Sequence, residues 1–128
     1  MDKTESKQNV TERIKTFEDA QRETGRPDVP EFLDVPEDLR EYFKAHYKMA
    51  VIAEALNEGH KANWEDNNEQ KWFPWFRMSS SGFAFGATVC CCSTTAAGYG
   101  TRLCFKSDEL ATYAGKQFIE IWNDILRK

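Results

Sequence analysis

The sequence predicts an α+β fold: a short N-terminal helix, a long helix, a three-stranded antiparallel meander and a C-terminal amphipathic helix. Two observations predict it. Apolar residues recur every three or four positions in two long segments, as expected of helices that bury one face. Between these segments lie three short strand-like runs: the first is aromatic and interrupted by Pro74, and in the other two apolar residues alternate along the chain, which is typical of half-buried strands. Strands enclosed between helical segments are typical of α+β domains.

The composition fits one soluble globular domain. The chain has 128 residues, of which 41% are hydrophobic and 30% charged, and its net charge is −4. This acidic balance lacks the basic face of a general nucleic-acid binder. No apolar run approaches the roughly 20 residues that span a bilayer, and the N-terminus lacks the apolar core of a secretion signal. The sequence therefore predicts a cytosolic, non-secreted protein that has no contact with membranes.

The first helix is expected between Thr11 and Thr24. Residues 1–10 are polar and aperiodic, which predicts a flexible arm ahead of a single domain over residues 11–128. Either Thr11 or Thr16 fits the cap position, and Thr16 with Asp19 matches the pattern that precedes many helices. Gly25 is a natural stop.

The longest element is expected from Pro36 to about Gly59. A proline-rich connector precedes it, and Pro36 suits the first turn of a helix. The apolar face of this helix is expected to contain Leu39, Tyr42, Ala45, His46, Met49, Ile52, Ala53 and Leu56.

Three strands are expected over residues 71–78, 82–92 and 100–106. Pro74 predicts an edge strand or a bulge, and the Ser-Gly segment over 79–82 predicts a turn. Short connections favour pairing between consecutive strands. Ser107 is the expected cap of the last helix, which runs almost to the end of the chain.

Four cysteines are the most conspicuous polar feature. Cys90, Cys92 and Cys104 would share one face if the last two strands paired, and His60 would complete a tetrahedral set for zinc. A disulfide between Cys90 and Cys104 is a second alternative. The favoured interpretation is that all four cysteines, Cys91 included, act as small apolar residues. No metal site is therefore predicted.

The two histidines also favour structural roles. His46 lies on the apolar side of the long helix, where a hydrogen-bonded buried imidazole is expected, and His60 is expected to be a polar loop residue. Neither a Walker loop nor a hydrolase or metalloprotease motif is present. The sequence therefore predicts no catalytic residue, no cofactor and no enzyme.

Aromatic residues cluster in and just before the first two strands. Core packing accounts for most of them, but both faces of the strands are apolar, so one face is expected to pack on helices while the other meets a partner. The flanking cations Lys71, Arg77, Arg102 and Lys106 also allow a stacking platform for bases. The candidate binding residues are Trp64, Trp72, Trp75, Arg77, Tyr99, Arg102 and Lys106.

Several segments carry a resemblance to a known family. These are WFPWF with SGFAFG, then GTRLCFKSDELATYAGKQFIEIW, and upstream IKTFEDA and MAVIAEALNEG. In these motifs the chain resembles small proteins encoded by phages and prophages of gut bacteria of the Bacteroides group. The family has no assigned activity, so the resemblance implies a viral origin and a location in the infected cell or the virion. Members of the family often have Tyr and Asp where this chain has Cys90 to Cys92, which implies that these cysteines are no shared metal site.

Three functional hypotheses follow. The first is a non-enzymatic phage protein that acts by self-assembly or by protein–protein binding. The second is a protein that sequesters a small anionic ligand such as a nucleotide signal, with Arg77, Arg102 or Lys106 on the phosphates. The third is binding of single-stranded nucleic acid, which the acidic charge balance makes the least favoured.

Overall fold

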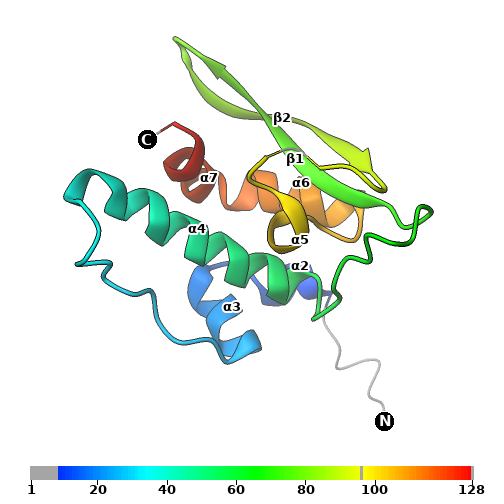
Figure 1. Cartoon of the computed structure of the whole chain (residues 1–128), viewed down its shortest axis with the longest axis horizontal. Coiled ribbons are helices and arrows are strands. Elements are labelled where there is room, and N and C mark those ends of the chain that lie inside the picture. Colours follow the sequence, from blue (N-terminus) through cyan, green and yellow to red (C-terminus); the bar gives the residue numbers. More distant parts are fainter. Residues whose placement is uncertain (1–8, 96, 128) are drawn as a thin grey trace.

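The structure, a computed structural model, describes residues 9–95 and 97–127 and has an α+β fold (Figure 1). Its described elements, in chain order, are α2 (Val10–Arg13), α3 (Phe17–Thr24), α4 (Glu37–Leu56), β1 (Lys71–Ser79), β2 (Gly82–Cys91), α5 (Gly100–Leu103), α6 (Asp108–Gln117) and α7 (Ile119–Leu126). The predicted class is therefore confirmed. The described sheet has two strands, β1 and β2, instead of three.

The N-terminal helix begins and ends as the sequence predicts. The side chain of Thr16 accepts a hydrogen bond from the N–H of Asp19, and the Asp19 carboxylate accepts one from the N–H of Thr16. At the other end Gly25 adopts a left-handed conformation, with φ of 74°. Val10 belongs to the short helix α2 and is buried, so the end of the predicted arm belongs to the body. Residues 1–8 of that arm lie outside the described residues.

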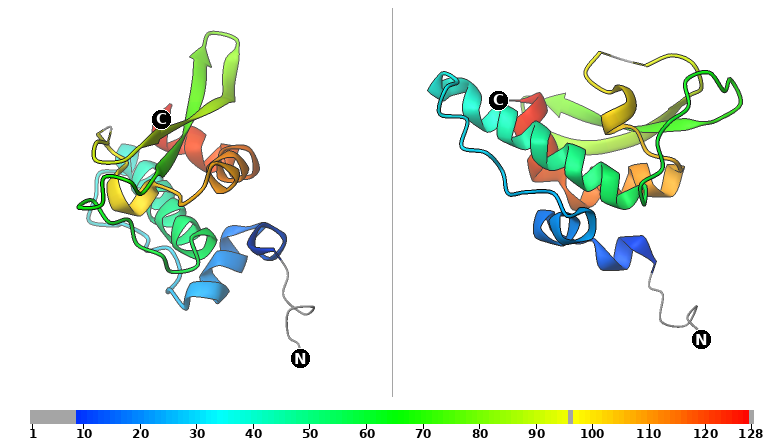
Figure 2. Two further views of the ribbon diagram at one scale, coloured as in Figure 1. Left: turned by 90° about the vertical axis from the view of Figure 1, so that its right-hand side faces the viewer. Right: turned by 60° about the horizontal axis from the view of Figure 1, so that its bottom comes forward.

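Helix α4 is the longest described helix and lies at the centre of the helical part of the molecule. It lies between the N-terminal helices and the C-terminal pair α6 and α7, as the views in Figure 2 show. Its buried face contains Met49, Ile52 and Leu56, all completely enclosed. The helix ends at Asn57, and Gly59 takes a positive φ of 82° just after it. No helix within residues 9–95 and 97–127 combines the length and apolarity required to cross a bilayer.

Strands β1 and β2 form an antiparallel hairpin that projects beyond the helices (Figure 2). Pairing runs from Lys71 opposite Cys91 to Ser79 opposite Gly82, with a bulge between Trp75 and Phe76. Because Ala87 pairs with Trp75 and Phe85 pairs with Phe76, Gly86 is the extra residue in β2. The predicted strict alternation along β2 is therefore wrong, since the bulge exchanges the faces beyond it.

The predicted third strand is also wrong, because residues 100–103 form the short helix α5. Only Phe105 pairs with a strand, and it pairs with Trp72 on the edge of β1 that faces away from β2. The side-chain amide of Asn57 donates to the carbonyl of Cys104 and accepts from the N–H of Lys106, both at 2.9 Å. Asn57 thus occupies the side of residues 104–106 that faces away from β1. Pairing with β1 stops after one residue because residues 100–103 are helical and the carbonyl of Pro74 accepts from the hydroxyl of Tyr99.

The predicted C-terminal helix is divided in two. Ser107 caps α6 as expected, since its Oγ accepts from the N–H of Leu110 at 3.1 Å. At Phe118 the backbone leaves helical geometry, with φ of −111° and ψ of 34°, and α7 begins at the next residue. The change of direction places the Trp122 ring against Phe76 of the hairpin, 5.4 Å between ring centres. The break therefore joins the helices to the sheet.

Candidate functional site

The predicted binding residues do not form one surface. Two of them are structural, three lie around the loop that follows α4, and two are exposed on the hairpin. In that order they are Trp72 and Tyr99, then Trp64, Arg102 and Lys106, then Trp75 and Arg77.

Trp72 and Tyr99 hold β1 to the body. The backbone of Trp72 pairs with Phe105, and its half-buried side chain packs against the core. Tyr99 lies edge-on to Phe73, 4.9 Å between ring centres, and its hydroxyl donates to the carbonyl of Pro74 at 3.2 Å. Burial raises the pKa of Tyr99. Neither aromatic ring is presented to a partner.

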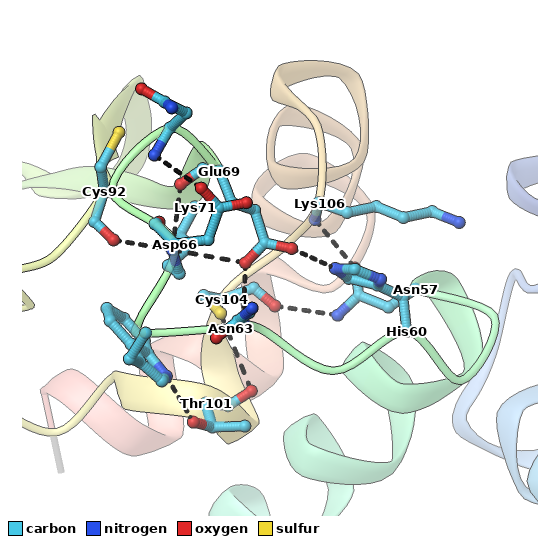
Figure 3. A network of polar contacts seen from close by, with 12 residues as sticks. Asn57, His60, Asn63, Asp66, Glu69, Lys71, Cys92, Thr101, Cys104 and Lys106 are labelled. Carbon is cyan, nitrogen blue, oxygen red and sulfur yellow. Dashed lines mark hydrogen bonds and ion pairs between the residues drawn. The ribbon is translucent and has the colours of Figure 1, made fainter.

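Lys71 is the centre of the polar network in Figure 3. The residue is 1% exposed, and its ammonium donates to the carbonyls of Cys92 (2.7 Å) and Glu69 (3.0 Å). It also lies 3.3 Å from the Glu69 carboxylate and 4.9 Å from the ring centre of Trp64. Lys71 thus fastens the loop over residues 60–70 to the end of β2.

Glu69 ties the same loop together. Its carboxylate accepts from the N–H of Asn63 at 2.6 Å and lies 2.8 Å from Nε2 of His60. The bond from Asn63, with contributions from Lys71 and His60, lowers the pKa of Glu69. Trp64 of this loop donates from Nε1 to Oγ1 of Thr101 at 2.7 Å. His60 and Trp64 therefore have structural partners.

A polar pocket of about 90 Å³ lies beside this loop and is lined by Arg102, Thr101, Lys61, His60, Gly59, Asn57, Glu54 and Ala50. The side chains of Arg102 and Lys61 are positively charged, so the pocket meets one requirement of the predicted binding of an anionic ligand. However, no Trp, Tyr or Phe side chain lines the pocket, and it also holds the carboxylate of Glu54. Lys106 lies apart and pairs with Glu58 at 3.3 Å. The stacking platform that a nucleotide or a base requires is not assembled here.

The four cysteines carry free thiols and do not form a metal site. Trp72 of β1 pairs with Cys90 on one side and with Phe105, next to Cys104, on the other. Since β1 lies between Cys90 and Cys104, the expected shared face does not exist. Burial raises the pKa of both thiols, which disfavours the thiolate form. Within the described residues no group of three metal-binding side chains comes together.

The most exposed apolar side chains of the sheet lie on the projecting part of the hairpin. Trp75 is 58% exposed and Met78 is 56% exposed. We define the hairpin surface as the exposed residues of this projecting part: Trp75, Arg77, Ala84 and Ala87 on one face, and Met78, which pairs with Phe83, near the turn on the other face. On the face of Trp75, Ala87 pairs with Trp75 and Ala84 pairs with Arg77, so a small residue lies beside each of these two large side chains.

The face of the hairpin opposite Trp75 holds the hairpin on the body, and Met78 lies on this face beyond the contacts with the helices. Phe76 stacks on Phe83, 4.9 Å between ring centres, and contacts Trp122 of α7. Phe85 lies so close to α6 that a Cβ atom at Gly115 would be 2.5 Å from its ring. Thr88 donates to the carboxylate of Asp108 at 2.7 Å. Trp75 and Met78 are therefore presented by an anchored element instead of a loose loop.

His46 departs from its predicted role. Its Nε2 is buried and has no hydrogen-bond partner in the described part of the chain, and the ring lies edge-on to Tyr42. It borders an apolar pocket of about 150 Å³ between α4, α7 and Tyr99. Burial lowers the pKa of His46. The predicted hydrogen bond is thus absent at Nε2, and the neutral imidazole is the favoured form.

We expect His46 to make the protein less stable as pH falls from 7 to 5. An unfolded imidazole binds its proton near pH 6.5, whereas the folded one does so only at lower pH, so protonation in this window favours the unfolded chain. Urea unfolding of His46→Phe should show a weaker loss of stability over this range. Ile52→Val, a change in the same helix that leaves both imidazoles in place, is the matched control and should keep the wild-type pH dependence. Equal pH dependence in wild type and His46→Phe would contradict the assignment.

The fold and the exposed hairpin together define a small α+β domain with one projecting apolar surface. No known protein family, no curated protein and no solved structure matches the chain. The resemblance to phage proteins described above therefore stays a prediction.

Sequence reasoning missed Met78 and misplaced Lys71. Met78 lies at the end of β1, next to the turn that the sequence predicts at Ser79. Its position beside this turn is the sequence signal that could have identified it as an exposed residue. Lys71 was expected to be an exposed flanking cation but is almost fully buried. Nothing in the local sequence indicates this burial, because it depends on carbonyl groups of Glu69 and Cys92.

Proposed function

We propose that this protein is a non-enzymatic binding protein that acts by protein–protein contact, in its simplest form by self-assembly, through the hairpin surface. The observation that carries the proposal is the exposure of Trp75 and Met78 on one projecting, anchored hairpin. Trp and Arg dominate the binding energy of many interfaces, and Met is enriched there. The hairpin surface contains all three.

Charge supports the same function. Between Trp72 and Cys91 the only charged residue is Arg77, although 30% of the whole chain is charged. Depletion of charged residues is the compositional feature of interface centres. A projecting element of this kind is costly to leave in water, so burial against another protein is favourable.

The other two hypotheses have less support. The polar pocket beside Arg102 lacks an aromatic wall, and Trp64 and Tyr99 are engaged in structural contacts. Among the predicted aromatic candidates, Trp75 has only Arg77 as a neighbouring cation along β1, which is a weak basis for a nucleic-acid platform. We therefore rank ligand sequestration second and single-strand binding third.

The biological setting of this proposal rests on sequence resemblance alone. If the chain belongs to the phage and prophage proteins that it resembles, its partner is a second copy or another protein of the virion or the infected cell. This setting adds no catalytic role to any residue.

Replacement of Trp75 by Ala together with Met78 by Ser should abolish assembly without unfolding the domain. Both side chains lie mostly in water, so the melting temperature should change little. Loss of a central Trp typically costs at least about 2 kcal/mol of binding, roughly a 30-fold weaker association. Sedimentation velocity over a range of concentrations measures this change directly.

The matched control replaces Leu33 and Leu39 by Ser, because these are also exposed apolar residues but lie away from the hairpin. This control should sediment as the wild type does. Identical sedimentation of the wild type and the Trp75/Met78 variant would contradict the proposed function.

A further inference from the structure

The outer edge of β2 is an unpaired strand edge. Trp72 directs its N–H and C=O toward Phe105, away from β2, so its partner Cys90 must direct its own groups to the opposite side. By the same alternation, with the bulge at Gly86 included, Thr88, Phe85 and Phe83 direct theirs outward too. In the described chain no backbone group pairs with this edge.

This edge also lacks the features by which proteins block strand pairing. Strand β2, Gly82–Cys91, contains no charged residue and no proline. Edge strands are usually protected by lysine, proline or a covering segment. Strand β1 has such a cover, since Phe105 and Tyr99 occupy its outer edge near the body. The outer edge of β1 is therefore covered near the body, whereas no described backbone group covers the outer edge of β2.

We propose that a second copy of this chain pairs with β2 along this edge, antiparallel, to give a continuous four-stranded sheet. This inference rests on the proposed function and names its partner and its contact. Any partner must supply an unpaired strand, and the chain itself supplies one. Because β2 carries no charged residue, two copies can pair along it without bringing like charges together. Most other segments of this acidic chain would bring like charges together.

The outward positions are also arranged symmetrically. A two-fold axis between Gly86 and Ala87 places Phe83 opposite the second copy's Cys90 and Phe85 opposite the second copy's Thr88. All four outward positions thus meet outward positions. Next to the axis, Gly86 of each copy lies opposite Ala87 of the other, and these small residues allow the two backbones to approach.

The variant that tests the edge is Thr88→Pro. Thr88 pairs with Pro74 without a ladder hydrogen bond, so the change removes an outward N–H and leaves the hairpin ladder intact. The matched control is Thr88→Val, which also loses the bond to Asp108 but keeps the N–H. We expect Thr88→Val to assemble as the wild type does and Thr88→Pro to associate at least about tenfold more weakly in sedimentation velocity.

Amide hydrogen exchange of the wild-type protein, kept under reducing conditions, tests the same edge without any variant. The N–H groups of Phe85 and Thr88 should exchange at least about tenfold more slowly in concentrated than in dilute protein. That of Val89, which already pairs with Phe73, should change less. No concentration-dependent protection at Phe85 and Thr88 overturns the proposal.

The two proposals can fail separately. Dissociation of the Trp75/Met78 variant together with unchanged assembly of Thr88→Pro would overturn the paired edge and leave the proposed function in place. A wild-type protein that sediments as a monomer at every concentration would overturn both.

Discussion

Replacement of Lys71 by Met should destabilise the protein by about 3 kcal/mol, although the two side chains have similar length. The change leaves the carbonyls of Glu69 and Cys92 without their donor and the Glu69 carboxylate without its closest cation. Because Lys71 joins the loop over residues 60–70 to the end of β2, the loss should also loosen that loop. Urea unfolding followed by circular dichroism measures the free energy.

Lys106→Met provides the matched control for Lys71→Met. Lys106 is exposed and its ammonium pairs with Glu58 at 3.3 Å, so the same substitution should cost less than about 1 kcal/mol. An equal loss of unfolding free energy at the two positions would show that the buried contacts of Lys71 add no stability, and would contradict the network in Figure 3.

Gly115→Leu should separate the hairpin from α6. A Cβ atom at this position would lie 2.5 Å from Cδ1 of Phe85 and 3.1 Å from Cβ of Pro74. Helix propensity alone would favour leucine by almost 1 kcal/mol, but overpacking of this contact should outweigh it and cost about 3 kcal/mol. The melting temperature should fall, and proteolysis within the hairpin should become faster.

The matched test adds Phe85→Ala to Gly115→Leu. Removal of the ring opens the space that the leucine requires, so the double variant should be more stable than the sum of the single effects predicts. Simple additivity of the two changes would mean that Gly115 and Phe85 do not contact each other, and would contradict the position of the hairpin.

Local signals in the sequence predicted most element boundaries correctly. The cap at Thr16 and the stop at Gly25 depend only on nearby backbone groups, and both are confirmed. The same holds for Ser107 at the start of α6 and for the two strands around the turn at Ser79. Caps and tight turns are decided within about four residues, which explains why a single sequence is sufficient for them.

The features that depend on distant contacts were not predictable. Residues 100–106 alternate like a strand, but residues 100–103 form α5, and the carbonyl of Pro74, where the pairing would continue, accepts from the hydroxyl of Tyr99. The bulge at Gly86 and the break at Phe118 likewise bring Phe85 against Gly115 and Trp122 against Phe76. Nothing in the local sequence contains these partners.

The candidate site was predictable only in composition. The aromatic surplus indicated that some rings would be exposed, and Trp75 and Arg77, two of the predicted binding candidates, are both exposed. Which tryptophans are exposed depends on the strand order, because Phe105 covers Trp72 while nothing in the described chain covers Trp75.

The most direct test of the account is fluorine NMR of protein labelled with 5-fluorotryptophan, recorded from dilute to concentrated solution with a soluble paramagnetic agent. The chain has four tryptophans, and Trp122, 1% exposed, is an internal control for a buried ring. We predict that the Trp75 signal is accessible to the agent in dilute protein and becomes protected as the concentration rises, while Trp122 is protected throughout. A Trp75 signal that stays accessible at every concentration would contradict self-assembly through the hairpin surface.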